Sequence, residues 1–292
     1  MDEQDVSIPL SRRLRHWVGI ASAASSRREI FGIETTVVRF NSSVFFVPDY
    51  AAHRPVSQRI LGRHLVSPAL HVLVREVMAR RPGSMVHAGT FFGDMLPSFA
   101  RKTVGTVYAF EPVMENYLLA RAVVSSNRLE NVMLLHAGLA ADAGVAQVQT
   151  NRGKRHFGGA SRIVSDPTKK TFRPQPVPVM TIDQFHIDDL SLIQLDVEGF
   201  ELPVLQGAVD TIRAHEPVIV VEDNRNNCSG LLADLGYVEV GRVGVDQVYL
   251  TASAANEFGG LAARCRRRAR TLGSRVGSLD RGHHPVELPE GA

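Results

Sequence analysis

Acidic residues stand where one apolar segment of the sequence ends. Residues 190–197 (LSLIQLDV) are typical of a buried strand, and Asp196 comes near its end. Glu198 follows two residues later, and Gly199 permits a tight bend into a helix predicted from Glu201. An unpaired carboxylate is costly to bury in an apolar sheet. Asp196 is therefore expected to face a binding site at the end of its strand.

A second candidate site follows an earlier apolar run. Residues 85–91 (MVHAGTF) predict a short strand, with Gly89 and Gly93 in the turn and Asp94 near the start of the next helix. Glycine lets a backbone approach a ligand closely, and the N–H groups at a helix start attract an anion. Taken alone, this pair of glycines is equally compatible with a turn that serves packing.

A third acid, Glu111, ends the strand predicted at 106–112 (TVYAFEP), 22 residues after the first of these glycines, and Pro112 follows it. A carboxylate at this place can accept hydrogen bonds from both hydroxyls of a ribose. The glycine turn carries two phenylalanines instead of the Gly-x-Gly-x-x-Gly pattern of dinucleotide sites. The spacing therefore favours S-adenosylmethionine as the cofactor, and a nicotinamide-dependent oxidoreductase is the less favoured alternative.

These turns belong to a region, from about residue 85 to residue 222, in which strands and helices alternate. The predicted strands also include 131–140, 146–151, 177–182 and 217–224, and the predicted helices are 94–102, 114–128, 201–215 and 230–236. Segments 237–243 and 246–252 add an antiparallel pair. Such alternation predicts a mostly parallel sheet covered on both faces, with ligands at the carboxyl ends of its strands.

Four regions are expected along the 292 residues: an N-terminal extension (1–34), a hairpin with helical cover (35–84), a core domain (85–255) and a basic, disordered tail (256–292). The hairpin is predicted to turn at 41–43. No apolar segment is long enough to cross a membrane. The two cysteines fit a reducing compartment, and a cytoplasmic protein is expected.

Basic residues gather in two places. Residues 261–281 hold seven arginines against one acid, which predicts a solvated tail, with contact to an anionic membrane surface or to nucleic acid as the alternatives. Residues 151–176 hold seven basic residues against Asp166, so this loop could close over an acceptor that bears phosphate or carboxylate groups; a merely solvated loop is equally compatible. No specific nucleic-acid partner is expected, and a homodimer is left open.

Over residues 35–252 the sequence resembles the FkbM-type S-adenosylmethionine-dependent methyltransferases. LIQLDVEGFELPVLQGA is similar to the family's Asp-x-Glu-Gly-x-Glu signature, and VYAFEP, NRLENVMLLHAGLA with Asp142, GGAS, and VPVMTIDQF with Asp183 match in order. The resemblance implies a Rossmann-like class I methyltransferase fold: a seven-stranded, mostly parallel sheet with helices on both faces and an antiparallel last strand. It also implies O-methylation of a sugar, a glycolipid or glycan, or a secondary metabolite.

On this interpretation one group of residues binds the cofactor and a smaller group supplies the base. The expected cofactor contacts are His87, Gly89, Gly93, Asp94, Glu111, Pro112, His136, Ala137 and Asp196, and the candidate bases are Asp196, Glu198 and His87. His87 stands where the family usually has the acid that holds the methionine amino group, so Asp94 or Asp196 would have to replace that acid. A non-catalytic module with the same fold is the alternative. Asp196, Glu198, Glu222 and Asp223 could converge on magnesium, but no diagnostic ligand spacing is present and no metal is predicted.

Overall fold

The computed structural model describes residues 26–149, 151–152, 155–156, 162–164, 175–223 and 227–273, and it describes the side chains of these residues except within 151–164 and 271–273. In the described residues, no helix is both long and apolar enough to cross a membrane.

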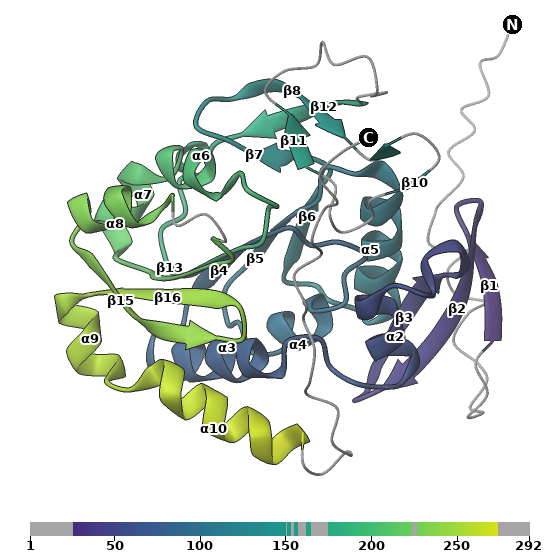
Figure 1. Ribbon diagram of the computed structural model, residues 1–292, viewed down its shortest axis with the longest axis horizontal. Helices are drawn as coiled ribbons and strands as arrows, with labels where there is room; N and C mark the ends of the chain where they lie inside the picture. The colour runs from purple at the N-terminus through teal and green to yellow at the C-terminus, as the bar shows by residue number, and fades with distance from the viewer. Residues whose placement is uncertain are drawn as a thin grey trace, which may run out of the picture.

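A seven-stranded sheet forms the centre of the protein, in the order β15-β16-β14-β13-β4-β5-β6 (Figure 1). Its strands are β4 (Ser84–Ala88), β5 (Val107–Phe110), β6 (Val132–Leu135), β13 (Leu190–Leu195), β14 (Val218–Val221), β15 (Tyr237–Val243) and β16 (Asp246–Thr251). The five strands from β14 to β6 pair in parallel, whereas β16 runs antiparallel to β14 and β15 antiparallel to β16. This confirms the predicted mostly parallel sheet with an antiparallel last strand.

Helices cover both faces of this sheet, as predicted. One face packs against α3 (Pro68–Arg80), α4 (Leu96–Ala100), α9 (Ala252–Phe258) and α10 (Leu261–Gly273). The other face packs against α6 (Glu201–Gln206), α7 (Val209–His215) and α8 (Ser229–Asp234). Side chains alternate along a strand, so in β4 Met85 faces the first layer of helices and Val86 faces the second.

A three-stranded antiparallel sheet precedes the core. It comprises β1 (Ser26–Ile30), β2 (Ile33–Phe40) and β3 (Ser43–Pro48), followed by η2 (Asp49–Ala51) and α2 (Pro55–Leu61). The predicted hairpin is confirmed, with Asn41 and Ser42 in left-handed backbone conformation at its turn. The predicted boundary at residue 34 is wrong, because β1 already belongs to this sheet. Most of β1 is exposed, so it shows no apolar alternation from which a strand could be predicted.

The predicted strand 131–140 is divided between two sheets. The chain leaves the main sheet after Leu135, and β7 (Gly138–Leu139) then joins a second sheet of order β11-β8-β12-β7. The other strands of this sheet are β8 (Gly144–Gln149), β11 (Arg162–Val164) and β12 (Gln175–Met180), and β9 (Asn151–Arg152) pairs with β10 (Arg155–His156). The predicted strand is interrupted because β6 lies at the edge of the main sheet, so the chain after Leu135 can pair with a different sheet.

The helix predicted at 201–215 is likewise two helices, α6 and α7. Gly207 separates them, and a Cβ atom there would lie 2.1 Å from the carbonyl oxygen of Ala140. Beside the break, Asp183 in η4 (Asp183–Phe185) accepts hydrogen bonds from the backbone nitrogen (2.8 Å) and the hydroxyl (2.7 Å) of Thr211. In this structure Asp183 therefore holds the start of α7.

The prediction of a disordered tail from residue 256 is wrong for its described part. Residues 261–273 form α10, whose Leu261, Ala262 and Cys265 are buried. These side chains pack between α3 and β15, the elements that α10 contacts most. The apolar stripe of α10 is narrow and lies among many arginines in the sequence, so the sequence did not predict that this helix packs against the core.

Candidate active site

The turn after β4 touches the end of β13 directly. Gly89 has φ +85°, and a Cβ atom on it would lie 1.8 Å from the carbonyl oxygen of Asp196. The backbone nitrogen of Asp196 also donates to the carbonyl of Ala88 (3.1 Å). Gly93 has a different role, since a Cβ atom there would lie 3.0 Å from Cα of Ala120 in α5 (Met114–Ser126). Of the two predicted glycines, Gly89 lies at the candidate site and Gly93 serves helix packing.

Glu111 lies beside this turn with its carboxylate buried. One oxygen accepts a hydrogen bond from the backbone nitrogen of Phe91 (2.7 Å). The other accepts from the backbone nitrogen of Val113 (2.9 Å) and from the side chain of Asn116 (3.3 Å). Burial outweighs these hydrogen bonds and raises the pKa of Glu111 to about 7. A carboxylate has about four acceptor positions, so a ribose that bonded both its hydroxyls here would have to displace the long Asn116 bond.

The two aromatic residues of the glycine turn are directed toward the N-terminal sheet. Phe92 is fully buried in a cluster that includes Phe46 of β3 and Leu119 of α5. Phe91, in left-handed conformation with φ +52°, packs against the same cluster, and the two rings lie 4.5 Å apart. These rings join the N-terminal sheet to the core.

His87 is sealed inside the protein. The side chain is 1% exposed, its Nδ1 forms a hydrogen bond with Oε1 of Gln194, and its ring meets the ring of Phe99 edge-on at 5.1 Å. Burial lowers the pKa of His87 to about 4, and Nε2 has no hydrogen-bond partner among the described residues. His87 shares a strand face with Met85, under α4. The structure thus separates His87 from solvent, which does not favour it as a base or as a cofactor contact.

Five carboxylates lie near one another at the carboxyl ends of β13 and β14. We call this group the acidic edge (Asp196, Glu198, Glu201, Glu222 and Asp246). Asp196 is half-buried, and its pKa is raised well above the usual value by burial and by the charges of the other four acids. The pKa of Asp246 is raised to about 7 by burial and by the charge of Glu222. Asp246 was not predicted; it joins the group because antiparallel β16 begins where β14 ends, with Val221 opposite Gln247.

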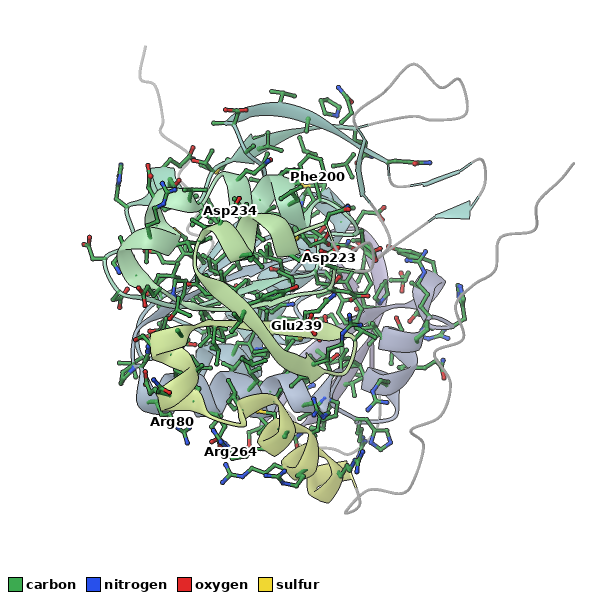
Figure 2. The ribbon with its side chains drawn as sticks, turned by 60° about the vertical axis from the view of Figure 1, so that its left-hand side comes forward. Arg80, Phe200, Asp223, Asp234, Glu239 and Arg264 are labelled. Atoms are coloured by element: carbon green, nitrogen blue, oxygen red, sulfur yellow. The ribbon has the colours of Figure 1, made fainter. Side chains whose placement is uncertain are left out.

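Two neighbouring acids have structural partners. Glu201 is buried, and one oxygen accepts hydrogen bonds from the backbone nitrogens of Val197 (3.2 Å) and Gly199 (3.0 Å), which fixes the turn after β13. Asp223 accepts from the backbone nitrogen of Cys228 (2.7 Å). Figure 2 labels Phe200 and Asp223, which mark the turns after β13 and β14. Among the described side chains, no three His, Cys, Asp or Glu residues are placed to hold a metal ion.

Glu198 lies exposed at the tip of the turn after β13, with φ +54°. It is therefore open to solvent beside Asp196, as a second candidate base would need to be. Asp94, by contrast, is buried at 6% exposure, and burial raises its pKa to about 7.

Two of the expected cofactor contacts, His136 and Ala137, lie beside Glu111 and Pro112. Nε2 of His136 hydrogen-bonds with the carbonyl oxygen of Pro112 (3.0 Å), and Ala137 is buried. The ring of Tyr117 lies 5.2 Å from that of His136. Tyr117 was not predicted as a site residue, although its position in the first turn of the helix after Pro112 could have indicated it.

Other residues singled out by the resemblance lie apart or outside the described residues. Asp142 is exposed in the loop after β7. The GGAS segment (158–161) and the basic side chains of 151–176 lie outside the described side chains. A surface hollow of about 410 Å³ lies at the opposite, amino-terminal edge of β13, lined by Arg81, Asp189, Arg213 and Glu216 among others.

The protein is similar to several solved methyltransferase structures. Methyltransferase FkbM from Methylobacillus flagellatus shares 17% identity at a TM-score of 0.42, over 58% of this chain and 44% of that one. A methyltransferase from Geobacter sulfurreducens shares 14% sequence identity at a TM-score of 0.41, over 68% of this chain and 86% of that one. A SAM-dependent methyltransferase from Aquifex aeolicus shares 17% sequence identity at a TM-score of 0.37, over 69% of this chain and 95% of that one. The chain thus spans less than half of the first of these proteins. None of the curated proteins matches the sequence.

A family model described as the methyltransferase FkbM domain matches residues 83–238. The match runs from the start of β4 into β15 and includes the glycine turn, Glu111 and most of the acidic edge. It confirms the family predicted from the sequence and supports S-adenosylmethionine as the methyl donor. Since more than half of the residues are matched, the chain belongs to the FkbM methyltransferase family.

Proposed function

We propose that this protein transfers the methyl group of S-adenosylmethionine to a hydroxyl oxygen of a sugar, a glycolipid or glycan, or a secondary metabolite. The observation that carries the proposal is Asp196. It is a half-buried carboxylate of raised pKa at the carboxyl end of β13, in contact through its backbone with the turn at Gly89. In open parallel sheets this edge is where ligands bind.

The residues at this edge fit a cationic nucleoside. Glu111 offers an acceptor for the ribose, and Tyr117 with His136 offers a half-buried aromatic surface for the adenine. The acidic edge brings carboxylates so close that burial and mutual repulsion disfavour their charged forms. A sulfonium or ammonium cation would relieve this repulsion. Because His87 is buried, we assign the amino group of the cofactor to Asp94, or to Asp196 if Glu198 is the base.

Asp196 is the base that the geometry supports best. When bound, S-adenosylmethionine supplies a methyl carbon activated by its sulfonium sulfur. Asp196 would accept the proton of the acceptor hydroxyl, and its raised pKa makes its carboxylate a stronger base near neutral pH. Such general-base assistance contributes roughly 100- to 10,000-fold to a rate. Holding the hydroxyl in line with the methyl group supplies much of the remainder. Glu198 is the alternative base.

The negative charge of the acidic edge affects how an anionic acceptor could bind. A phosphate or carboxylate group would be repelled by the acidic edge. An acceptor of that kind would therefore present its neutral hydroxyl to Asp196 and its anionic group to the basic segment 151–176. We keep this segment as the proposed contact for an anionic acceptor.

Transfer of a tritiated methyl group from S-adenosylmethionine into a cell extract tests the proposal. We expect labelled product whose methyl group resists mild alkali, as an ether does and an ester does not. Asp196→Asn should lower the rate at saturating cofactor by about 100-fold or more, whereas Asp142→Asn, on an exposed loop, should leave it unchanged. Alkali-labile label, or full activity of Asp196→Asn, would refute the assignment.

A non-catalytic module remains the second candidate, because the position of the family's acid is filled by the sealed His87. Titration calorimetry with S-adenosylmethionine separates the two. Heat of binding is expected for the enzyme, and its complete absence would favour a scaffold.

A further inference from the structure

The C-terminal helix α10 is held to the core by its apolar side. Leu261 and Cys265, one helical turn apart, are no more than 1% exposed and pack between α3 and β15. This side is therefore already covered by the protein. Whatever binds the outer side of α10 meets mainly arginine side chains.

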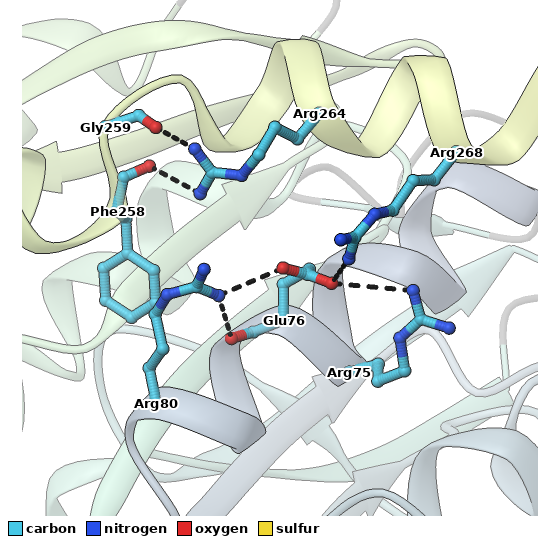
Figure 3. A network of polar contacts seen from close by, with 7 residues as sticks. All are labelled: Arg75, Glu76, Arg80, Phe258, Gly259, Arg264 and Arg268. Carbon is cyan, nitrogen blue, oxygen red and sulfur yellow. Dashed lines mark hydrogen bonds and ion pairs between the residues drawn. The ribbon is translucent and has the colours of Figure 1, made fainter.

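One buried carboxylate anchors the helix to α3. Glu76 forms ion pairs with Arg268 of α10, with Arg80 (3.0 Å) and with Arg75 (3.5 Å), as Figure 3 shows. Burial favours the neutral acid, but the hydrogen bond from Arg80 and the charges of Arg268, Arg80 and Arg75 outweigh it and lower the pKa of Glu76. Three guanidinium groups thus share one carboxylate, which leaves the cluster positively charged.

Most of the charge on this surface is not neutralised. We call it the basic face. It combines eight arginines of α3, α10 and the residue after α3 (Arg75, Arg80, Arg81, Arg264, Arg266, Arg267, Arg268 and Arg270) with Glu76 and with Glu257 of α9. Arg267 and Arg270 are exposed, and within the described part of the chain neither forms an ion pair. A surface of this charge attracts polyanions.

Exposed apolar side chains adjoin the basic face. Arg266 of α10 donates to the carbonyl oxygen of Arg242 in β15, so the helix lies directly against this edge strand. Val238 and Val240 of β15, and Val245 in the turn that follows it, are 36–53% exposed. Figure 2 shows α10 and β15 next to one another on the outside of the molecule.

This combination suits a lipid surface better than a nucleic acid. Arginines beside exposed aliphatic side chains match anionic headgroups and the shallow apolar layer beneath them. Proteins that hold single-stranded nucleic acids add aromatic rings on which bases stack. The one aromatic residue of α10 and β15 is Tyr237, and it is buried.

We propose that the basic face docks on an anionic phospholipid bilayer, with α10 lying flat on the headgroups. Attachment is mainly electrostatic, because the apolar side of α10 is used within the protein and only the three valines of β15 and its turn are exposed beside it. Binding should therefore require anionic lipid and should be reversed by salt. The proposal does not depend on the reaction assigned to the site.

Sedimentation of the full chain with vesicles tests this. The vesicles contain phosphatidylcholine alone, or with roughly one third phosphatidylserine. Binding is expected only to the anionic vesicles, in about 0.05 M NaCl, and should be lost near 0.5 M. The variant Arg267→Glu/Arg270→Glu leaves the Glu76 anchor in place and should bind roughly 30-fold more weakly or worse.

A matched variant, Arg39→Glu/Arg121→Glu, changes the net charge equally at exposed positions on β2 and α5, away from α10 (Figure 1). It should bind vesicles within about threefold of the unmodified protein. Thermal melting of both variants serves as the control that they fold. Equal loss in both variants, equal binding to neutral vesicles, or a short nucleic-acid duplex that binds more tightly and displaces the vesicles would each overturn the proposal.

Discussion

Ionisation of Asp246 should destabilise the protein as pH rises, and Asp246→Asn should remove this effect. The side chain is 4% exposed, and burial together with the charge of Glu222 raises its pKa from 3.8 to about 7. Since the folded-state pKa lies above that of the unfolded chain, only the unfolded state ionises between these values. The group therefore stabilises the fold below about pH 4 and loses that contribution as pH rises to about 7. At about 1.36 kcal/mol for each pKa unit, the full loss is about 4 kcal/mol.

Urea unfolding at several pH values measures this directly. Asparagine mimics the neutral acid, so the variant should match the unmodified protein near pH 4 and exceed its free energy of unfolding by about 2 kcal/mol at about pH 5.5 and about 4 kcal/mol at about pH 8. Asp142→Asn, at an exposed position, should show no such growth. A difference for Asp246→Asn that stays constant from pH 4 to 8 would refute the assigned burial and charge coupling.

Three further substitutions have definite expectations. Gly89→Ala should lower the free energy of unfolding by more than the ~1–2 kcal/mol that a left-handed backbone costs a residue with a Cβ atom, because this Cβ atom would also overlap the carbonyl of Asp196. The control Gly144→Ala, which has open space around it, should change the free energy of unfolding by less than ~0.5 kcal/mol in the same denaturation assay. Glu111→Gln should weaken S-adenosylmethionine binding roughly 10- to 100-fold in calorimetry, the value of a hydrogen bond to a charged group; unchanged affinity would remove Glu111 from the site. Glu76→Gln should lower the free energy of unfolding by about 1–2 kcal/mol, and less at high salt, because three arginines lose their shared partner; a stabilising effect would contradict the anchoring role.

The parts of the fold that the sequence predicted are those with a local pattern. The apolar runs at 190–197 and 217–224 became the central strands β13 and β14, and the pair at 237–252 became β15 and β16. Apolar runs of this kind are produced by burial on both faces of a sheet. The contact between the Gly89 turn and Asp196 was also predictable, since both follow strands that end at the same edge.

The remaining features depend on contacts between distant segments. Asp246 reaches the acidic edge only through the antiparallel register of β16 on β14. The burial of His87 depends on Gln194, its neighbour in the next strand, and on Phe99 in α4. The apolar stripe of α10 is narrow because α3 and β15 cover only one side of the helix. No pattern within a single segment carries such information.

A crystal structure with bound S-adenosylhomocysteine is the most direct test of the central claim, that the carboxyl edge of the sheet holds the methyl donor. The ribose hydroxyls should lie within hydrogen-bond distance of Glu111, with the amino-acid end beside the turn from Gly89 to Asp94. The claim would be contradicted if Glu111 kept its hydrogen bonds to Phe91, Val113 and Asn116 with no nucleoside at this edge, or if the compound occupied the hollow beside Arg81 and Arg213.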